Sequence, residues 1–295
     1  MFLAQIRAED GTLQVVAREG TEAFVICNCA STYDLARDCA NRGVTLKQRI
    51  ATLGLGAAVD VEGALAQGRV LAPIHHPDPT QMYLSGVALN DTATDDNAGP
   101  FGPDWIYKGD GRAIGAPGMA LLVSDFAPDS GTGPSVAAVY IVSDSGTPFR
   151  IGFAMANDFS DRILTTQSHA AVVQGRLRPL ALGPEMVLAT LPEGINGSLR
   201  LTRDAEAITD IAISTGRDNL EAAIARLERD HFASDSLCQP GQLHILVIAL
   251  AQGITASASI GDTTTLTLSG FGLPLCNPLH HAPRGPDAPV QINAL

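Results

Sequence analysis

Short apolar stretches broken by polar turns open the chain. Residues 2–7, 13–17 and 22–27 are rich in apolar side chains, and each is short enough for a single strand. The gaps between them contain the turn signals Asp-Gly at 10–11 and Glu-Gly at 19–20. This pattern predicts three short strands joined by tight turns.

Apolar positions at helical spacing follow these strands. Ser31 can cap a helix that Gly43 ends, because serine accepts hydrogen bonds from the first turn and glycine tolerates the left-handed conformation after the last one. The segments 44–55 and 61–67 continue the helical pattern. We therefore predict a small N-terminal α/β domain over residues 1–70.

A β-hairpin is the clearest element of the rest of the chain. The stretches 135–143 and 149–156 alternate around the turn signal at 144–146, and the second stretch leads into Asp158. More strands are expected at 83–89, 186–190, 197–202, 207–214, 241–251 and 262–268.

One helix interrupts these strands. The spacing of apolar residues predicts it over 218–231, with Asp218 as its cap. We accordingly expect a mainly-β domain over residues 71–280 and a loose tail over 281–295.

The charge balance excludes two classes of partner. The 295 residues include 19 basic and 31 acidic side chains, a net charge of −12, and contain no cluster of Lys or Arg. Nucleic acids and anionic membrane surfaces would be repelled by such a protein. No apolar run approaches the roughly 20 residues of a membrane helix. We expect a cytoplasmic protein that binds neither nucleic acid nor membrane.

Several side chains fit either a metal site or an ordinary structural role. Cys27 and Cys29 could be metal ligands, although the apolar stretch before them favours buried thiols. His75 and His76 could be ligands or could rigidify a proline-rich turn. The acidic loop 90–100 could hold a hard cation or be a solvated loop.

Aromatic and basic residues lie close together in a glycine-rich segment. Trp105, Tyr107 and Lys108 could present a phenol and a cation to a small anionic ligand. They could equally pack a corner of the sheet.

A combination of short motifs resembles the fumarylacetoacetate hydrolase superfamily. The resemblance is greatest to its sugar-acid branch, which includes GguC-like proteins and 2-oxo-3-deoxy-pentonate dehydratases. It covers nearly the whole chain and rests on residues 76–79, 107–111, 157–162, 231–232, 240–244 and 271–279. The resemblance implies an α+β, mainly-β protein: a mixed β-sandwich roll behind a small N-terminal α/β domain, assembled as a homodimer.

The resemblance also implies a divalent ion, held by a Glu-x-Glu pair and an aspartate. Asp158 matches the aspartate, whereas Gly133 and Ser135 fall at the two glutamate positions. Neither can replace an anionic ligand of a hard cation. We therefore expect a degenerate metal site, with Asp158 as a residual ligand and no cofactor. Mg²⁺ or Mn²⁺ would bind only if the ligand or other carboxylates rebuilt the site.

Other site residues follow from the same resemblance. Arg176 occupies the position of a usual lysine, and Asp91 that of a histidine base. We assign Asp91, Arg162 and Arg176 as candidate catalytic residues, and Tyr107, Lys108, Arg162 and Arg176 as candidate substrate-binding residues. The alternative is that Arg162, Arg176 and Asp158 form only a buried polar network.

Two functions are compatible with these residues. The first is a lyase or hydrolase that dehydrates or cleaves a small 2-oxo or 2-oxo-3-deoxy acid, with basic side chains acting as electrophiles where the metal is missing. The second is a non-catalytic paralogue that binds a small organic acid or a protein partner through the inherited pocket.

Overall fold

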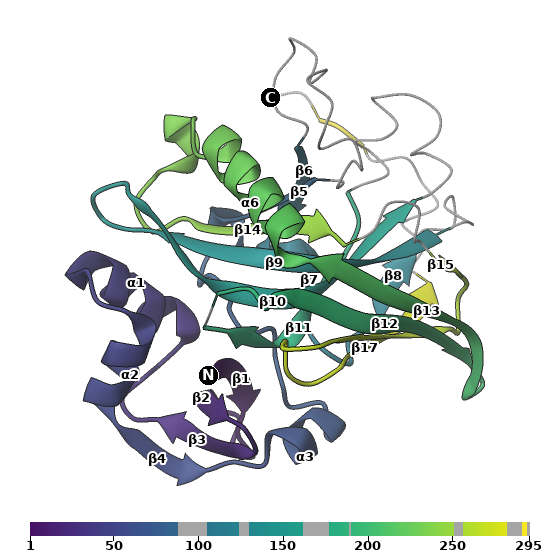
Figure 1. The fold of residues 1–295 in the computed structure, drawn as a ribbon, viewed down its shortest axis with the longest axis horizontal. Coiled ribbons are helices and arrows are strands. Elements are labelled where there is room, and N and C mark those ends of the chain that lie inside the picture. The colour runs from purple at the N-terminus through teal and green to yellow at the C-terminus, as the bar shows by residue number, and fades with distance from the viewer. Residues whose placement is uncertain are drawn as a thin grey trace.

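The computed structural model describes residues 1–87, 105–123, 130–161, 177–188, 190–250, 256–281 and 291–293. In these ranges the chain forms two β-sheets (Figure 1). The larger sheet contains β1 (Phe2–Arg7), β2 (Leu13–Glu19), β3 (Glu22–Ile26), β4 (Leu55–Ala58), β5 (Met82–Val87), β6 (Ile106–Asp110), β7 (Ile114–Gly115), β9 (Ser130–Val142), β10 (Pro148–Asp161), β11 (Leu180–Val187), β14 (Leu243–Ala249) and β15 (Ala256–Ala258).

The smaller sheet and the helices complete the described fold. The smaller sheet consists of β8 (Leu121–Val123), β12 (Gly194–Arg203), β13 (Glu206–Gly216), β16 (Thr263–Leu268) and β17 (Leu275–His281). The α-helices are α1 (Thr32–Arg42), α2 (Leu46–Leu53), α3 (Val61–Ala66) and α6 (Arg217–His231). The expected mainly-β, α+β class is confirmed.

The N-terminal elements agree with the sequence pattern, with one exception. β1, β2, β3 and α1 lie where they were predicted, and the Ser31 hydroxyl accepts from the Asp34 amide at the start of α1. The predicted helix 44–55 is too long, because α2 ends at Leu53, Gly54 follows with φ 81°, and Leu55 begins β4. Helix propensity of Leu and Ala is outweighed there by pairing with β3.

The predicted hairpin is present and longer than expected. β9 and β10 pair from Val142 and Pro148 to Ser130 and Asp161, with one bulge between Arg150 and Gly152. Asp158 therefore lies within a strand, opposite Gly133, whereas the predicted stretch 149–156 ended before it. The extension of β9 back to Ser130 provides the backbone partners that keep β10 extended.

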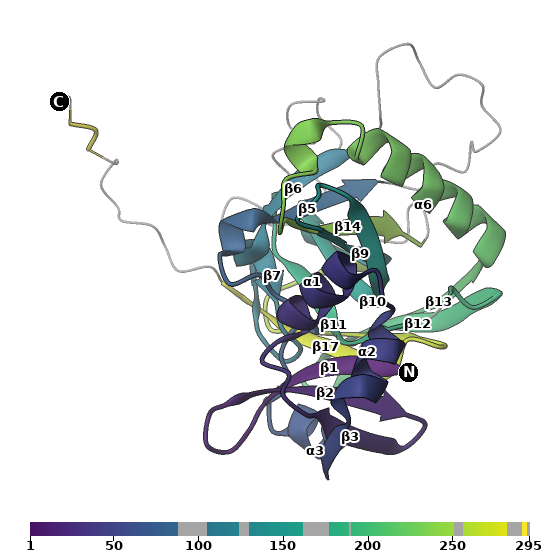
Figure 2. The same ribbon diagram turned by 90° about the vertical axis from the view of Figure 1, so that its left-hand side faces the viewer.

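The larger sheet has the strand order β4-β3-β2-β1-β11-β10-β9-β14-β5-β6. Two short strands lie outside this order: β15 pairs with β9, and β7 pairs with β11. It is continuous from the N-terminal strands into the rest of the protein, since β1 pairs with β11. Its two faces bury different cores. One, here called the inner core, includes side chains of α1 and α2 together with Ala137, Val139, Ala154 and Ala156; Figure 2 shows α1 across β9 and β10.

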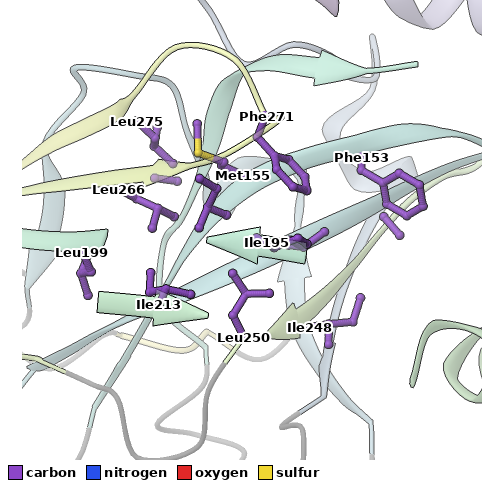
Figure 3. Close-up of a cluster of buried hydrophobic side chains, with 14 of the residues drawn as sticks. Phe153, Met155, Ile195, Leu199, Ile213, Ile248, Leu250, Leu266, Phe271 and Leu275 are labelled. Carbon is purple, nitrogen blue, oxygen red and sulfur yellow. The ribbon is translucent and has the colours of Figure 1, made fainter. Parts of the chain in front are cut away.

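The second face contacts the smaller sheet and α6. Here called the intersheet core, it includes the labelled side chains of Figure 3, among them Phe153, Met155 and Leu250. α6 runs beside β9 and β14 (Figure 1), and the Tyr140 hydroxyl donates to Glu228 of this helix over 2.8 Å. The predicted cap of α6 is wrong, because Gly216 occupies the N-cap position and no side chain caps it.

A buried ion pair fastens the N-terminal hairpin to the rest of the fold. The side chain of Glu185 on β11 is fully buried and accepts two bonds from Arg18 on β2, each 2.6 Å long. It also accepts from the Leu273 amide at 2.9 Å. One carboxylate thus joins three segments that are distant in the sequence. Among the described residues, no helix is long and apolar enough to cross a membrane.

Removal of Arg18 should be costly for this reason. We expect Arg18→Met to lower the free energy of unfolding by about 3 kcal/mol or more, because it leaves the Glu185 carboxylate buried without its cation. Urea denaturation measures this change. The matched control is Arg42→Met, which removes an exposed ion pair with Asp38 and should lower the stability much less than Arg18→Met does. Equal effects of the two substitutions would contradict the account.

Candidate functional site

A buried ion pair lies at the centre of the candidate site. The Lys108 ammonium on β6 is 2.6 Å from Oδ1 of Asp158 on β10. Only 1% of the lysine side chain and 7% of the aspartate side chain are exposed. Lysine and aspartate are rarely buried to this extent unless they are paired, so the two charges stabilise each other inside the protein.

The curvature of the larger sheet brings these two residues together. Three strands, β9, β14 and β5, separate β10 from β6 in the sheet. In a flat sheet the two strands would lie roughly 19 Å apart, at about 4.8 Å per step. A lysine and an aspartate cannot span that distance, so the contact requires the sheet to curl around the inner core.

Gly86 on β5 makes room for the lysine stem. A Cβ at Gly86 would lie 2.8 Å from Cδ of Lys108, which is closer than real Cβ contacts allow. The lysine side chain therefore crosses β5 directly over this glycine. The ammonium reaches Asp158 because the residue beneath its stem has no side chain.

The two positions predicted to have lost glutamates face the same side of the sheet as the ion pair. On β9, Ala137 and Val139 belong to the inner core, so the alternation of the strand puts Gly133 and Ser135 on that face too. The register pairs Gly133 with Asp158 and Ser135 with Ala156. The Ser135 hydroxyl donates to the Gly133 carbonyl over 3.3 Å.

Among the residues that the structure describes, the arrangement around Asp158 does not fit a divalent metal ion. Magnesium requires close to six oxygen ligands in octahedral geometry, whereas the described residues next to Asp158 offer a glycine and a serine. The ammonium group of Lys108 already contacts the carboxylate from which such an ion would be held. Nor do the described residues contain any group of three His, Cys, Asp or Glu able to hold a metal.

Asn157, the neighbour of Asp158, has a different role. It faces the intersheet side, where its Oδ1 accepts from the Thr132 hydroxyl and its Nδ2 donates to Thr264 over 3.0 Å. The Thr264 hydroxyl in turn donates to the Asn277 carbonyl at 3.2 Å. The asparagine thus ties the hairpin to the smaller sheet while the aspartate enters the inner core.

The other predicted site residues are placed as follows. Tyr107 adjoins Lys108 on β6, so it points to the opposite face, and its side chain is partly exposed. Asp91, Arg162 and Arg176 lie outside the described residues. Their assignments stay predictions.

The histidine turn at 75–76 has structural partners. Nδ1 of His75 lies 2.9 Å from Nε2 of Gln5, and Nδ1 of His76 accepts from the Asp78 amide at 2.9 Å. His76 also contacts the Tyr33 ring at 4.5 Å between centroids. These contacts support the structural interpretation of the turn.

A buried histidine pair was not foreseen from the sequence. Nε2 of His231, the last residue of α6, lies 3.0 Å from Nδ1 of His244 on β14. Both side chains are fully buried, and within the described chain His231 Nδ1 and His244 Nε2 have no hydrogen-bond partner. His244 stacks on Tyr83 at 5.3 Å, and His231 meets the Trp105 ring edge-on at 5.0 Å.

Burial keeps both imidazoles uncharged. It lowers the pKa of His231 to about 4 and that of His244 to about 3, and in His244 the neighbouring His231 adds to the effect. Only the fold brings the two residues together, since one ends a helix and the other lies within a strand.

Comparison with solved structures identifies the class of fold. Apo 2-keto-3-deoxy-D-arabinonate dehydratase is similar over 96% of this chain and 100% of its own, with a TM-score of 0.70 and 16% identity. The same enzyme complexed with magnesium and 2,5-dioxopentanoate gives a TM-score of 0.69 and 18% identity over the same shares of the two chains. This chain has the fold of the fumarylacetoacetate hydrolase superfamily, as the motifs predicted.

A further relative in structure has a different activity. The 5-carboxymethyl-2-hydroxymuconate delta-isomerase of Mycobacterium smegmatis is similar over 96% of this chain and 100% of its own, with a TM-score of 0.63 and 17% identity. No family model matches the sequence. No curated protein matches it either. At these identities the comparisons establish the fold and leave the reaction open.

The histidine pair predicts a loss of stability in acid. Below pH 6.5 the unfolded chain binds protons at both imidazoles, whereas the folded chain does not until the pH approaches 4 and then 3. Unfolding is therefore favoured as the pH falls through this window. At about 1.4 kcal/mol per pKa unit, the lowered pKa of His231 alone accounts for a loss on the order of 3 kcal/mol in the free energy of unfolding.

Urea denaturation at pH 7, 6, 5 and 4 measures the effect. We expect His231→Phe to flatten the fall in stability between pH 6.5 and 4, and the exposed His280→Gln to leave its slope unchanged. The same slope in His231→Phe and the unaltered chain would show that the pair does not cause the acid sensitivity.

Proposed function

We propose that this chain is a lyase or hydrolase of the fumarylacetoacetate hydrolase type that acts on a small 2-oxo or 2-oxo-3-deoxy acid without a metal ion. The observation that carries the proposal is the Lys108–Asp158 ion pair, which lies where the resemblance places the divalent cation. The lysine brings a fixed positive charge to the position from which a metal would polarise the substrate.

The chemistry of a 2-oxo acid suits an ammonium group. Removal of a proton next to its carbonyl builds negative charge on the carbonyl oxygen, and a hydrogen-bond donor with a positive charge stabilises that oxygen. In the proposed complex Lys108 donates to this oxygen while Asp158 orients the ammonium. The side chains that face the pair from β9 and β10 are small, namely Gly133, Ser135 and Ala156, as a site for a compact acid requires.

The structural relatives support this substrate class. The dehydratase that resembles this chain was solved with 2,5-dioxopentanoate, which is itself a 2-oxo acid. It was also solved with magnesium, and this is where we expect the present chain to differ. Asp91 remains the proposed base, with Arg162 and Arg176 as proposed partners of the substrate carboxylate.

A second candidate is a protein that binds such an acid without converting it. The short contact between Lys108 and Asp158 favours it, because an ion pair that is already satisfied has less capacity to stabilise charge on a substrate. We further propose that either form acts as a homodimer, as the resemblance implies, and that it is cytoplasmic, as the sequence pattern predicts. Sedimentation analysis of the purified chain tests the homodimer.

Proton NMR of the protein mixed with 2-oxo-3-deoxy acids in excess EDTA tests the enzymatic proposal. We expect conversion of at least one acid, unaffected by EDTA. Lys108→Met should slow it by about 100-fold or more, the usual consequence of removing one charge-stabilising donor. Lys108→Arg, which keeps the positive charge, should retain part of the activity.

The control is Arg112→Met, which removes an exposed cation near the end of β6 and should leave the rate unchanged. Thermal denaturation confirms that each variant is folded. Conversion that requires added magnesium would refute the metal-free mechanism. Saturable binding without conversion of any acid would favour the second candidate.

A further inference from the structure

A groove that neither Lys108 nor Asp158 lines lies between the two N-terminal helices and the start of β10. It has a volume of about 590 Å³, within the range of sites that bind small molecules. Its walls come from the end of α1, the start of α2, β10 and the residues after β11. Apolar side chains form most of them, including Ala40, Leu46, Leu188 and Leu191.

A β-bulge shapes the wall that β10 contributes. Arg150 pairs with Tyr140 and Gly152 with Val139, so Ile151 is an extra residue without a partner on β9. Gly152 fixes this geometry, because a Cβ there would lie 2.7 Å from both Met186 Cγ and the Val187 carbonyl oxygen. Bulges of this kind re-aim side chains, and here Ile151 lines the groove.

Two hydrophobic side chains at the groove remain exposed to solvent. Val44 is 37% exposed and Phe149 is 38% exposed. Both line the groove from opposite walls, one after α1 and the other on β10. A ligand with an apolar body would remove this surface from water, which favours binding by about 25 cal/mol per Å² of apolar area.

Two cations border the same groove in a protein with a net charge of −12. Lys47 is exposed, and its ammonium has no partner among the described residues. Arg150 is paired with Glu228 through one bond of 2.8 Å from Nη1, and its guanidinium lies over the Phe153 ring at 5.2 Å. Within the described chain its other N–H groups donate no further bond, so they can still reach an anion in the groove. The acidic residue among the described lining side chains, Glu221, lies 3.8 Å from Arg217.

We propose that this groove is a binding site for a small amphipathic carboxylate, distinct from the Lys108–Asp158 site. The apolar body lies along Ala40, Leu46 and Ile151, and the carboxylate meets Lys47 and Arg150. A combination of apolar walls with a few convergent cations selects an anion with a hydrophobic chain over both a neutral lipid and a hydrophilic acid. The site does not depend on the proposed reaction.

Isothermal titration with octanoate, 1-octanol and acetate tests the proposal. We expect octanoate to bind one site per chain, at least about tenfold more tightly than 1-octanol because of the two cations. Acetate should show no binding. Lys47→Met should weaken octanoate about fivefold and leave 1-octanol unchanged, whereas Arg229→Met, an exposed cation elsewhere, should change neither.

Ala40→Phe, which fills the groove, should abolish binding of both eight-carbon compounds. Val44→Asp, on an exposed loop, is the second variant if Ala40→Phe does not fold, and should repel octanoate. Equal affinities for octanoate and 1-octanol would overturn the proposal, as would octanoate binding that survives both variants. Light scattering that shows octanoate dissociating a dimer would also overturn it, since the groove would then be an interface between two copies.

Discussion

The burial of one positive and one negative charge constrains the architecture of this protein. Lys108 and Asp158 contact each other at 2.6 Å with almost no exposure to solvent. Taking either ion out of water alone costs several kcal/mol, so each requires the other. The contact in turn requires the curled sheet that brings β6 to β10, and the glycine at position 86 over which the lysine stem passes. The ion pair therefore depends on parts of the protein outside it, namely the curled sheet and Gly86.

The same ion pair changes the chemistry that the fold can support. A hard divalent ion is usually held by carboxylates together with other oxygens, whereas Gly133 has no side-chain oxygen and Ser135 offers one neutral hydroxyl. An ammonium group needs only one carboxylate, and Asp158 supplies it. The charge that polarises a 2-oxo acid would then belong to the protein chain, so the site would need no metal from solution.

Much of the fold was predictable because it depends on local patterns. The hairpin followed from alternation on both sides of the turn at 144–146, and α1 from Ser31 and Gly43 at its ends. The strand β4 was missed because Leu-Gly-Ala-Ala has no β pattern of its own and is held by β3. The partner of Asp158 was missed for a different reason: Lys108 is 50 residues away, and only the curl of the sheet brings them together. The His231–His244 pair depends on tertiary structure in the same way.

The claim that Lys108 takes the place of the metal ion is tested most directly by titrating the unaltered protein with Mn²⁺ and counting bound ions by electron paramagnetic resonance. The account predicts no stoichiometric site at millimolar protein, and no difference between the unaltered chain and Asp158→Asn. Binding of about one Mn²⁺ per chain that disappears in Asp158→Asn would contradict the account. Asp158 would then be a metal ligand, and Lys108 would not occupy the position of the ion.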